Sequence, residues 1–160
     1  MLISSSSLAN TEKKPSNSRL QETEDALGII LISQGSLATS LQEGVEHMLG
    51  EQPYIQSIPL ETDEKLESAQ NRLENAINQF SDMKAIVILA DLFGGTPCNA
   101  AMKFYKKGSI EVIAGVNLPF VVQLANMQGA HSLNDAIDAA HSAGHRYLIS
   151  CGDHIGYNLS

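Results

Sequence analysis

The fold is decided by residues 85–97, which read AIVILADLFGGTP. The first six residues are apolar and rich in β-branched side chains, and a loop with two glycines follows them. A short apolar run of this kind is typical of a parallel strand that is buried on both faces of a sheet. Thr96 and Pro97 then form the pattern of an N-cap followed by proline at the first helical position. The stretch predicts a buried strand, a tight loop and a helix that runs to Lys107 and is stopped by Gly108.

The same alternation of strand and helix extends to both sides of this stretch. Short apolar runs predict further strands at 29–32, 54–58, 111–114 and 147–150. Apolar residues at helical spacing predict helices at 37–49 and 66–80, one after Pro119, and one that the pair Ser132 and Asp135 opens. Strands that alternate with helices pack as right-handed crossover units. We therefore predict an α/β fold, a doubly wound, mostly parallel sheet with helices on both faces.

Composition divides the chain into three parts. Residues 1–26 are polar, with four serines at 4–7 and an acidic stretch at 22–25, and they have little to bury. Such a segment cannot offset the entropy that it would lose on ordering, so we predict a disordered N-terminal extension. The folded domain is expected at 27–151, and residues 152–160 are expected to form a short irregular tail.

The charge of the chain narrows the classes of partner. The formal net charge is -8 and only ten residues are Lys or Arg, which argues against binding to nucleic acid or to an anionic membrane.

The apolar runs are too short to span a membrane, and the first nine residues do not form a secretory signal. Cys98 and Cys151 are too few for a disulfide framework and are not spaced as metal ligands. We therefore predict a cytoplasmic protein with two reduced, buried cysteines, no metal or cofactor, and no direct membrane insertion.

Three loops are expected to meet at the carboxyl ends of the strands, at 33–36, 91–96 and 115–119. Ligands of open α/β sheets bind at this edge. The loop after residue 90 combines two glycines with the start of a helix, which is the chemistry of an anion site, phosphate above all. The same residues are also common in an ordinary tight turn. The loop matches neither the Walker A motif nor the dinucleotide-binding motif.

Several motifs in sequence order resemble the mannose-class enzyme IIA domain of the bacterial sugar phosphotransferase system. They are an Ile-rich first strand followed by a Gly-containing turn, MLGE at 48–51, ADLFGGTPCNAA at 90–101 and VIAGVNLP at 112–119. The resemblance covers residues 28–150, and it implies a doubly wound α/β domain, usually a homodimer that exchanges a C-terminal strand. Members of that family take a phosphoryl group from HPr onto a histidine and pass it to the IIB component. IIB in turn phosphorylates the sugar that a membrane IIC/IID permease brings in.

The resemblance also assigns candidate site residues. Asp91 would orient the phosphoacceptor and stabilise the charge that develops on it. Asn117 would line the facing wall of the site. The residues that would bind the phosphoryl oxygens are Gly35, Gly94, Gly95 and Thr96.

The chain departs from the family at the phosphoacceptor itself. The turn after the first strand should read His-Gly, but it reads Gln34-Gly35. Glutamine has a similar reach and can donate a hydrogen bond to Asp91 through its amide nitrogen. An amide nitrogen has no basic lone pair, however, so Gln34 cannot form the phosphoramidate. The resemblance therefore predicts a IIA-like protein that cannot be phosphorylated at the usual site, and it leaves enzymatic activity open.

Three interpretations of this departure remain open. The chain is a natural paralogue that binds IIB, HPr or an anion as a regulatory protein, or it is an engineered His-to-Gln form of an active phosphotransferase, or another residue accepts the phosphoryl group. For the third interpretation Asp91 is one candidate. The histidines are the others, although none follows a strand in the expected loop: His47, His131, His141, His145 and His154.

Overall fold

The protein is described by a computed structural model over residues 25–130 and 132–155. Four parallel strands form one sheet in the order β2-β1-β3-β4, which makes the predicted mostly parallel sheet fully parallel within the described residues. In chain order the elements are β1 (Leu27–Gln34), α2 (Leu37–Leu49), β2 (Ile55–Leu60), α3 (Leu66–Gln79), β3 (Ala85–Ala90), α4 (Thr96–Met102), β4 (Ile110–Ala114), α5 (Leu118–Asn126), α6 (Leu133–Arg146) and α7 (Cys151–Ile155).

The central strands β1 and β3 form the core of the domain. Every residue of β3 is buried, as is every residue of β1 except Gln34. Because side chains alternate along a strand, Ile29 and Leu31 pack on one face of the sheet, and Ile30 and Ile32 pack on the other. Burial on both faces explains why these strands read as continuous apolar runs.

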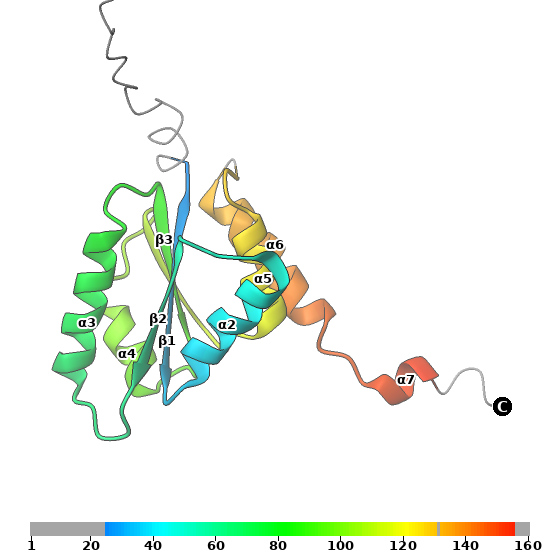
Figure 1. Ribbon diagram of the computed structural model, residues 1–160, viewed down its shortest axis with the longest axis horizontal. Coiled ribbons are helices and arrows are strands. Elements are labelled where there is room, and N and C mark those ends of the chain that lie inside the picture. The colour runs from blue at the N-terminus through cyan, green and yellow to red at the C-terminus, as the bar shows by residue number, and fades with distance from the viewer. Residues whose placement is uncertain (1–24, 131, 156–160) are drawn as a thin grey trace, which may run out of the picture.

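Helices cover both faces of the sheet, as the sequence predicts (Figure 1). The helices α2, α5 and α6 contribute buried residues to the core on one face, and α3 and α4 contribute buried residues to the core on the other. Each βα connection turns from the carboxyl end of a strand into the next helix. The loops that follow the four strands therefore lie at one edge of the sheet, at the lower end of the view in Figure 1.

The two edge strands differ in how they present their backbones. In β2, the carbonyl oxygen of Leu60 accepts a hydrogen bond from the Gly35 amide, so Leu60 faces β1. Since backbone groups alternate in direction along a strand, the neighbouring Pro59 faces the outer side, where it offers no N–H donor. Strand β4 forms the opposite edge, and all five of its residues are half-buried.

The predicted C-terminal strand at 147–150 is wrong. Helix α6 continues to Arg146, and the next four residues lie outside helix and strand. The side chains of Tyr147, Leu148 and Ile149 are 63%, 83% and 47% exposed, so this apolar run pairs with no strand in residues 25–130 and 132–155. The segment leads away from the body of the domain to α7 (Figure 1).

Four further expectations about local structure need correction. Helix α4 ends at Met102 rather than at Lys107, because Phe104 leaves the helix and packs against the core beside α3. The second strand continues through Pro59 to Leu60. Residues 152–155 belong to α7 and are not irregular, whereas the rest of the predicted tail and most of the predicted extension lie outside the described residues. Of the two cysteines, Cys98 is buried as expected, but Cys151 is exposed.

Candidate functional site

Four loops meet at the carboxyl edge of the sheet. The loop at 34–36 follows β1, the loop at 61–65 follows β2, the loop at 91–95 follows β3 and the loop at 115–117 follows β4. The strand order places the first loop between the second and the third. The sequence analysis places the candidate site at three of these loops and does not include the loop at 61–65.

Gln34, the last residue of β1, holds two neighbouring loops together. Its backbone amide donates to Asp91 Oδ2 at 2.9 Å. Its side-chain nitrogen Nε2 donates to the carbonyl oxygen of Glu61 at 2.7 Å. The expected bond between the Gln34 side chain and Asp91 is therefore replaced by a backbone bond, and the side chain turns toward the loop after β2.

Asp91 is the first residue after β3, and both of its carboxylate oxygens accept backbone hydrogen bonds. Oδ2 accepts from the Gln34 amide, and Oδ1 accepts from the Leu92 amide at 2.8 Å. A carboxylate can accept at both oxygens, so it suits a place between two N–H donors. Asp91 thus fixes the loop after β3 to the loop after β1, at the position where the sequence predicts an orienting carboxylate.

The predicted phosphate cradle lies beside Asp91 and differs in detail from the expectation. Gly95, not Thr96, occupies the N-cap position, and no side chain caps the seven-residue helix α4. Gly94 has φ 81°, a left-handed conformation that glycine adopts without strain. Its carbonyl oxygen accepts from Asn99 Nδ2 at 3.1 Å, which ties the loop to the first turns of α4. Phosphate binding by Gly35, Gly94, Gly95 and Thr96 remains a prediction.

Asn117 has two partners within the fold. Its Oδ1 accepts from the Phe120 amide at 3.0 Å and so caps α5, and its Nδ2 donates to the Gly144 carbonyl oxygen at 3.1 Å. These bonds join the start of α5 to α6. Both polar atoms of the side chain are thereby engaged, and the predicted contact of Asn117 with a ligand remains a prediction.

Ser33 supports the loop after β1 and is not among the residues that the sequence singles out. It is 2% exposed, and its hydroxyl group accepts from the Ala38 amide at 2.7 Å and donates to the Gly35 carbonyl oxygen at 3.2 Å. The hydroxyl therefore satisfies an amide in the first turn of α2 and fixes the turn that carries Gln34. A serine directly before the turn is the signal for this role.

Glu64 organises the loop at 61–65 and is also missed by the sequence analysis. Its carboxylate accepts from the Glu61 amide at 3.1 Å, from Ser68 Oγ at 2.9 Å and from Arg72 Nη1 at 2.9 Å. Burial raises the pKa of this carboxyl group, but the hydrogen bonds from Glu61, Ser68 and Arg72 and the charge of Arg72 together hold the pKa below its usual value of 4.5. The four-residue spacing of Glu64, Ser68 and Arg72, which runs from the loop before α3 into that helix, is the signal that could have indicated this cluster.

The lowered pKa of Glu64 predicts a pH-dependent contribution to stability. Because the folded chain lowers this pKa, the contribution is fully present above pH 4.5 and is lost as the pH falls through the folded value. We expect Glu64→Gln to lower the free energy of unfolding by less than about 1 kcal/mol at pH 7, since Arg72 is partly exposed. Urea unfolding between pH 3 and pH 7 should show the difference between variant and unchanged chain shrink below pH 4.5.

The matched control for this prediction is Glu67→Gln. Glu67 lies three residues after Glu64, in the first turn of α3, but within the described residues its side chain has no hydrogen bond or ion pair. A difference that stays the same at pH 3 and pH 7 in Glu64→Gln would contradict the assignment.

None of the histidines in the described part of the chain belongs to the four strand-end loops. His47 is exposed on α2, and His141 packs edge-on against Phe120 at 5.3 Å between ring centroids. His141 and His145 line a cavity of about 270 Å³ between α6 and the end of β4. His154 belongs to α7, and His131 lies outside the described residues. In residues 25–130 and 132–155, no three His, Cys, Asp or Glu side chains gather as metal ligands, and no helix is long and apolar enough to cross a membrane.

Comparison with known proteins gives consistent matches. Residues 28–141 match the family model described as PTS system fructose IIA component. The chain is 24% identical over 130 residues to the PTS system fructose-specific EIIA component of Bacillus subtilis (strain 168), over 81% of this chain and 89% of that protein. It is 34% identical over 98 residues to the PTS system sorbose-specific EIIA component of Lacticaseibacillus casei, over 61% of this chain and 70% of that protein.

The fold also matches solved structures. The phosphotransferase system component EIIA from Streptococcus agalactiae aligns with a TM-score of 0.72 and 22% identity, over 79% of this chain and 98% of that one. At this level of identity the likeness establishes the fold alone.

Proposed function

Because the chain belongs to the family of PTS system fructose IIA components, we propose that it works in a sugar phosphotransferase system by binding phosphoryl-carrier partners without itself accepting a phosphoryl group at position 34. The observation that carries this proposal is the place of Gln34. It ends the first strand, beside Asp91 and the glycine loop, where the family resemblance puts the phosphoacceptor histidine.

The chemistry of the side chain at position 34 supports this proposal. A histidine has a ring nitrogen with a lone pair that can attack phosphorus, whereas the lone pair of an amide nitrogen is delocalised into the carbonyl group. In addition, Nε2 of Gln34 is already engaged with the carbonyl oxygen of Glu61. The Asp91 carboxylate accepts from the Gln34 backbone amide, and the glycine loop follows Asp91 directly. We infer that the chain keeps the surface that binds phosphoryl-carrier partners although position 34 is glutamine.

The partners that this function requires are HPr and the IIB component, with a membrane IIC/IID permease as an indirect partner. Leu92 and Phe93, at the tip of the loop after β3, are 68% and 80% exposed and lie directly beside the candidate site. Exposed apolar side chains next to a site of this kind favour a protein partner. We place this function in the cytoplasm, without a metal or cofactor.

The experiment that tests the proposal combines two measurements on the unchanged full chain. The first is its intact mass after incubation with phosphoenolpyruvate, enzyme I and HPr, where we expect no phosphoryl adduct. The second is a titration of the isotope-labelled chain with HPr and with IIB, where we expect backbone resonances of the four loops to shift. A stable adduct would overturn the proposal, and mapping it to Asp91 or to a histidine would identify another acceptor. Absence of binding to either partner would overturn it as well.

We further propose that the chain forms a homodimer through its C-terminal segment and the open edge of β4. The half-buried β4 pairs with β3 on one side, and within the described residues only Ile110 of its outer side is bridged, by Lys106. Tyr147, Leu148 and Ile149 are exposed on a segment that leaves the body. An apolar segment and an open sheet edge can satisfy each other by strand addition between two copies.

Light scattering should therefore give the mass of a dimer for the full chain and the mass of a monomer for a chain that ends at Arg146. The matched control ends at Ile155 and removes only residues 156–160, and we expect it to remain dimeric. A monomeric full chain, or a dimeric chain that ends at Arg146, would contradict this arrangement.

A further inference from the structure

A continuous series of contacts leads from Gln34 into the body of α3. Gln34 Nε2 donates to the Glu61 carbonyl oxygen at 2.7 Å, and the Glu61 amide donates to Glu64 Oε2 at 3.1 Å. Arg72 Nη1 then donates to the same carboxylate oxygen at 2.9 Å. The Glu64 carboxylate thus binds the amide of Glu61, and the carbonyl oxygen of Glu61 binds the Gln34 side chain.

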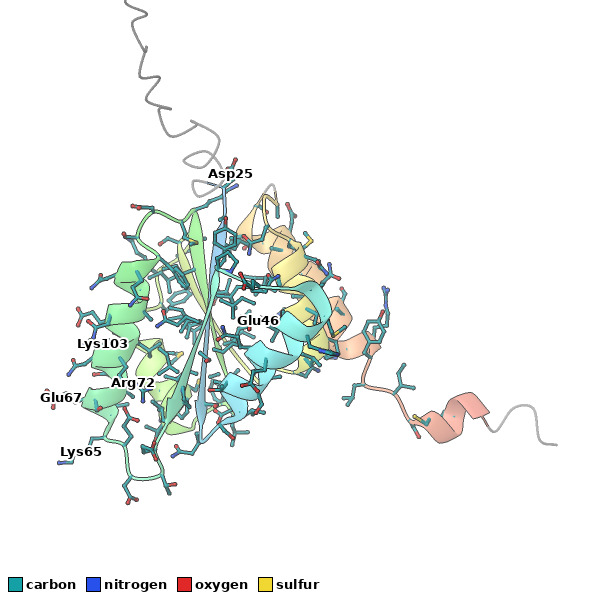
Figure 2. The ribbon with its side chains drawn as sticks, in the orientation of Figure 1. Asp25, Glu46, Lys65, Glu67, Arg72 and Lys103 are labelled. Atoms are coloured by element: carbon teal, nitrogen blue, oxygen red, sulfur yellow. The ribbon has the colours of Figure 1, made fainter. Side chains whose placement is uncertain are left out.

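Arg72 anchors this series at two places. Besides Glu64, its Nη1 donates to the carbonyl oxygen of Pro59 in β2 at 2.8 Å. The side chain extends from α3 (Figure 2) and so joins that helix to both ends of the β2–α3 connection. The Glu64 side chain is 9% exposed, which shields this carboxylate from competing water.

The loop at 61–65 presents the Glu61 carbonyl oxygen to the Gln34 side chain, and hydrogen bonds within the loop hold that oxygen in place. Glu61 is exposed at the surface, and a backbone carbonyl in an unsupported exposed loop would sample many orientations. Here the Glu61 carbonyl oxygen also accepts a hydrogen bond from the Glu64 amide at 3.0 Å, and the Glu61 amide donates to the half-buried Glu64 carboxylate. The peptide groups on both sides of Glu61 are therefore confined by bonds to Glu64. Fixing an acceptor in this way lowers the entropy cost of each hydrogen bond that it accepts.

We propose that Glu64 and Arg72 are positioning residues for the side chain at position 34, acting through the Glu61 carbonyl group. The inference rests on the proposed function in treating position 34 as the centre of the site. It assigns a role to Glu64 in the loop after β2 and to Arg72 on α3, and it concerns the orientation of the side chain at position 34 rather than its chemistry.

The consequence for the site is a defined amide orientation. Since a carbonyl oxygen can only accept, the group of Gln34 that faces Glu61 must be the NH₂ group. The amide is planar, so this bond also fixes the direction of the Gln34 oxygen Oε1. Within the described residues Oε1 has no hydrogen-bond partner, and it is therefore available to a donor on a bound partner.

Nuclear magnetic resonance of the isotope-labelled full chain tests the positioning role directly. The side-chain amide signal of Gln34 is assigned by its loss in Gln34→Ala. We expect its exchange with water to become about fivefold faster in Glu64→Ala and in Arg72→Ala, because each variant removes a side-chain bond that supports the turn at 61–64 and leaves the bond from the Glu64 amide to the Glu61 carbonyl oxygen in a looser turn. Arg72→Lys keeps a charged donor toward Glu64 and should give an intermediate rate.

Two other side-chain amides serve as internal controls. Asn117 Nδ2 donates to the Gly144 carbonyl oxygen and Gln128 Nε2 donates to the Leu27 carbonyl oxygen at 3.1 Å each, far from Arg72 in the fold. If their exchange rates rise as much as that of Gln34, Glu64 and Arg72 are general structural supports and the positioning role is overturned. If the Gln34 rate is unchanged in both alanine variants, the role is overturned too.

A second measurement separates this inference from the proposed function. A histidine at position 34 can donate one ring N–H to the Glu61 carbonyl oxygen, which leaves the other ring nitrogen unprotonated for attack. In the Gln34→His chain we therefore expect Arg72→Ala to slow phosphoryl uptake about tenfold. If Gln34→His takes up no phosphoryl group, the proposed function loses its support, while the amide exchange rates still decide the positioning role. An uptake rate that Arg72→Ala leaves unchanged would count against the positioning role alone.

Discussion

The Gln34→His variant is expected to take up a phosphoryl group from phosphorylated HPr that the unchanged chain does not accept. The substitution restores a ring nitrogen with a lone pair at the end of β1, next to the Asp91 carboxylate that already accepts a bond from the backbone of residue 34. The site around it needs no rebuilding, because the glycine loop and the first turn of α2 are in place. Since an amide is no nucleophile, we expect an increase in uptake rate of at least about 100-fold.

Intact mass after incubation with phosphoenolpyruvate, enzyme I and HPr measures this uptake. Gln34→Asn is the matched control, because it changes the side chain at the same place without introducing a ring nitrogen. Treatment at acidic pH should remove the adduct, as expected of a phosphoramidate. If Gln34→His stays unmodified while it still binds HPr, the cradle at 94–96 is not competent for phosphoryl transfer.

Replacing Asp91 is expected to have the second largest effect. Both oxygens of this carboxylate accept from backbone amides, those of Gln34 and Leu92. Asp91→Asn keeps one accepting oxygen and turns an NH₂ group toward a second N–H donor, so at most one of the two bonds survives. We expect a loss of about 1–3 kcal/mol in the free energy of unfolding. In the Gln34→His chain we also expect phosphoryl uptake to fall on the order of 100-fold, because the two loops are no longer fixed to each other.

Urea unfolding and the uptake assay together measure this effect. The matched control is Asp138→Asn, which removes an exposed carboxylate on α6 whose oxygens have no hydrogen bond within residues 25–130 and 132–155. It should leave both quantities unchanged. If Asp91→Asn is as stable and as reactive as its parent, Asp91 neither joins the loops nor orients the acceptor.

The core of the fold could be predicted from the sequence because its signal is local. The run at 85–90 is apolar at every position, and the structure buries every one of its side chains. Helix α2 ends before Gly50, which has φ 83°, as a glycine after a helical stripe predicts. The sequence analysis is wrong at two places where tertiary contacts determine the secondary structure. Phe104 ends α4 early by packing against the core, and the residues at 147–150 lack the neighbouring strand that their pattern suits.

The residues of the candidate site that belong to a sequence motif could be predicted. The contacts between residues far apart in the sequence could not. The family resemblance placed Gln34 and Asp91 at one point of the sheet edge, and a hydrogen bond joins them. That the backbone rather than the side chain of Gln34 makes this bond follows from the position of Glu61, which lies 27 residues away in the sequence. A local pattern of residue types does not show which residues distant in the sequence come into contact. The contacts of Ser33 and Glu64 are local, with partners two to eight residues away, and the sequence analysis did not use the signals at these positions. Arg72 also reaches Pro59, 13 residues away, and this contact emerged only from the structure.

The β2 and β4 edges of the sheet differ in their free backbone donors, and this difference limits how many copies of the chain the proposed strand addition could join. On the β2 side, Pro59 faces outward without an N–H donor, so a further strand could not complete a ladder there. On the β4 side the edge is open beyond Ile110, which Lys106 bridges, within the described residues. In the proposed dimer the C-terminal segment of each copy would pair with the β4 edge of the other, so both β4 edges would be used and no third copy could add to them. The outward-facing Pro59 would keep the β2 edge out of such pairing, which would stop the head-to-tail stacking that leads to fibres.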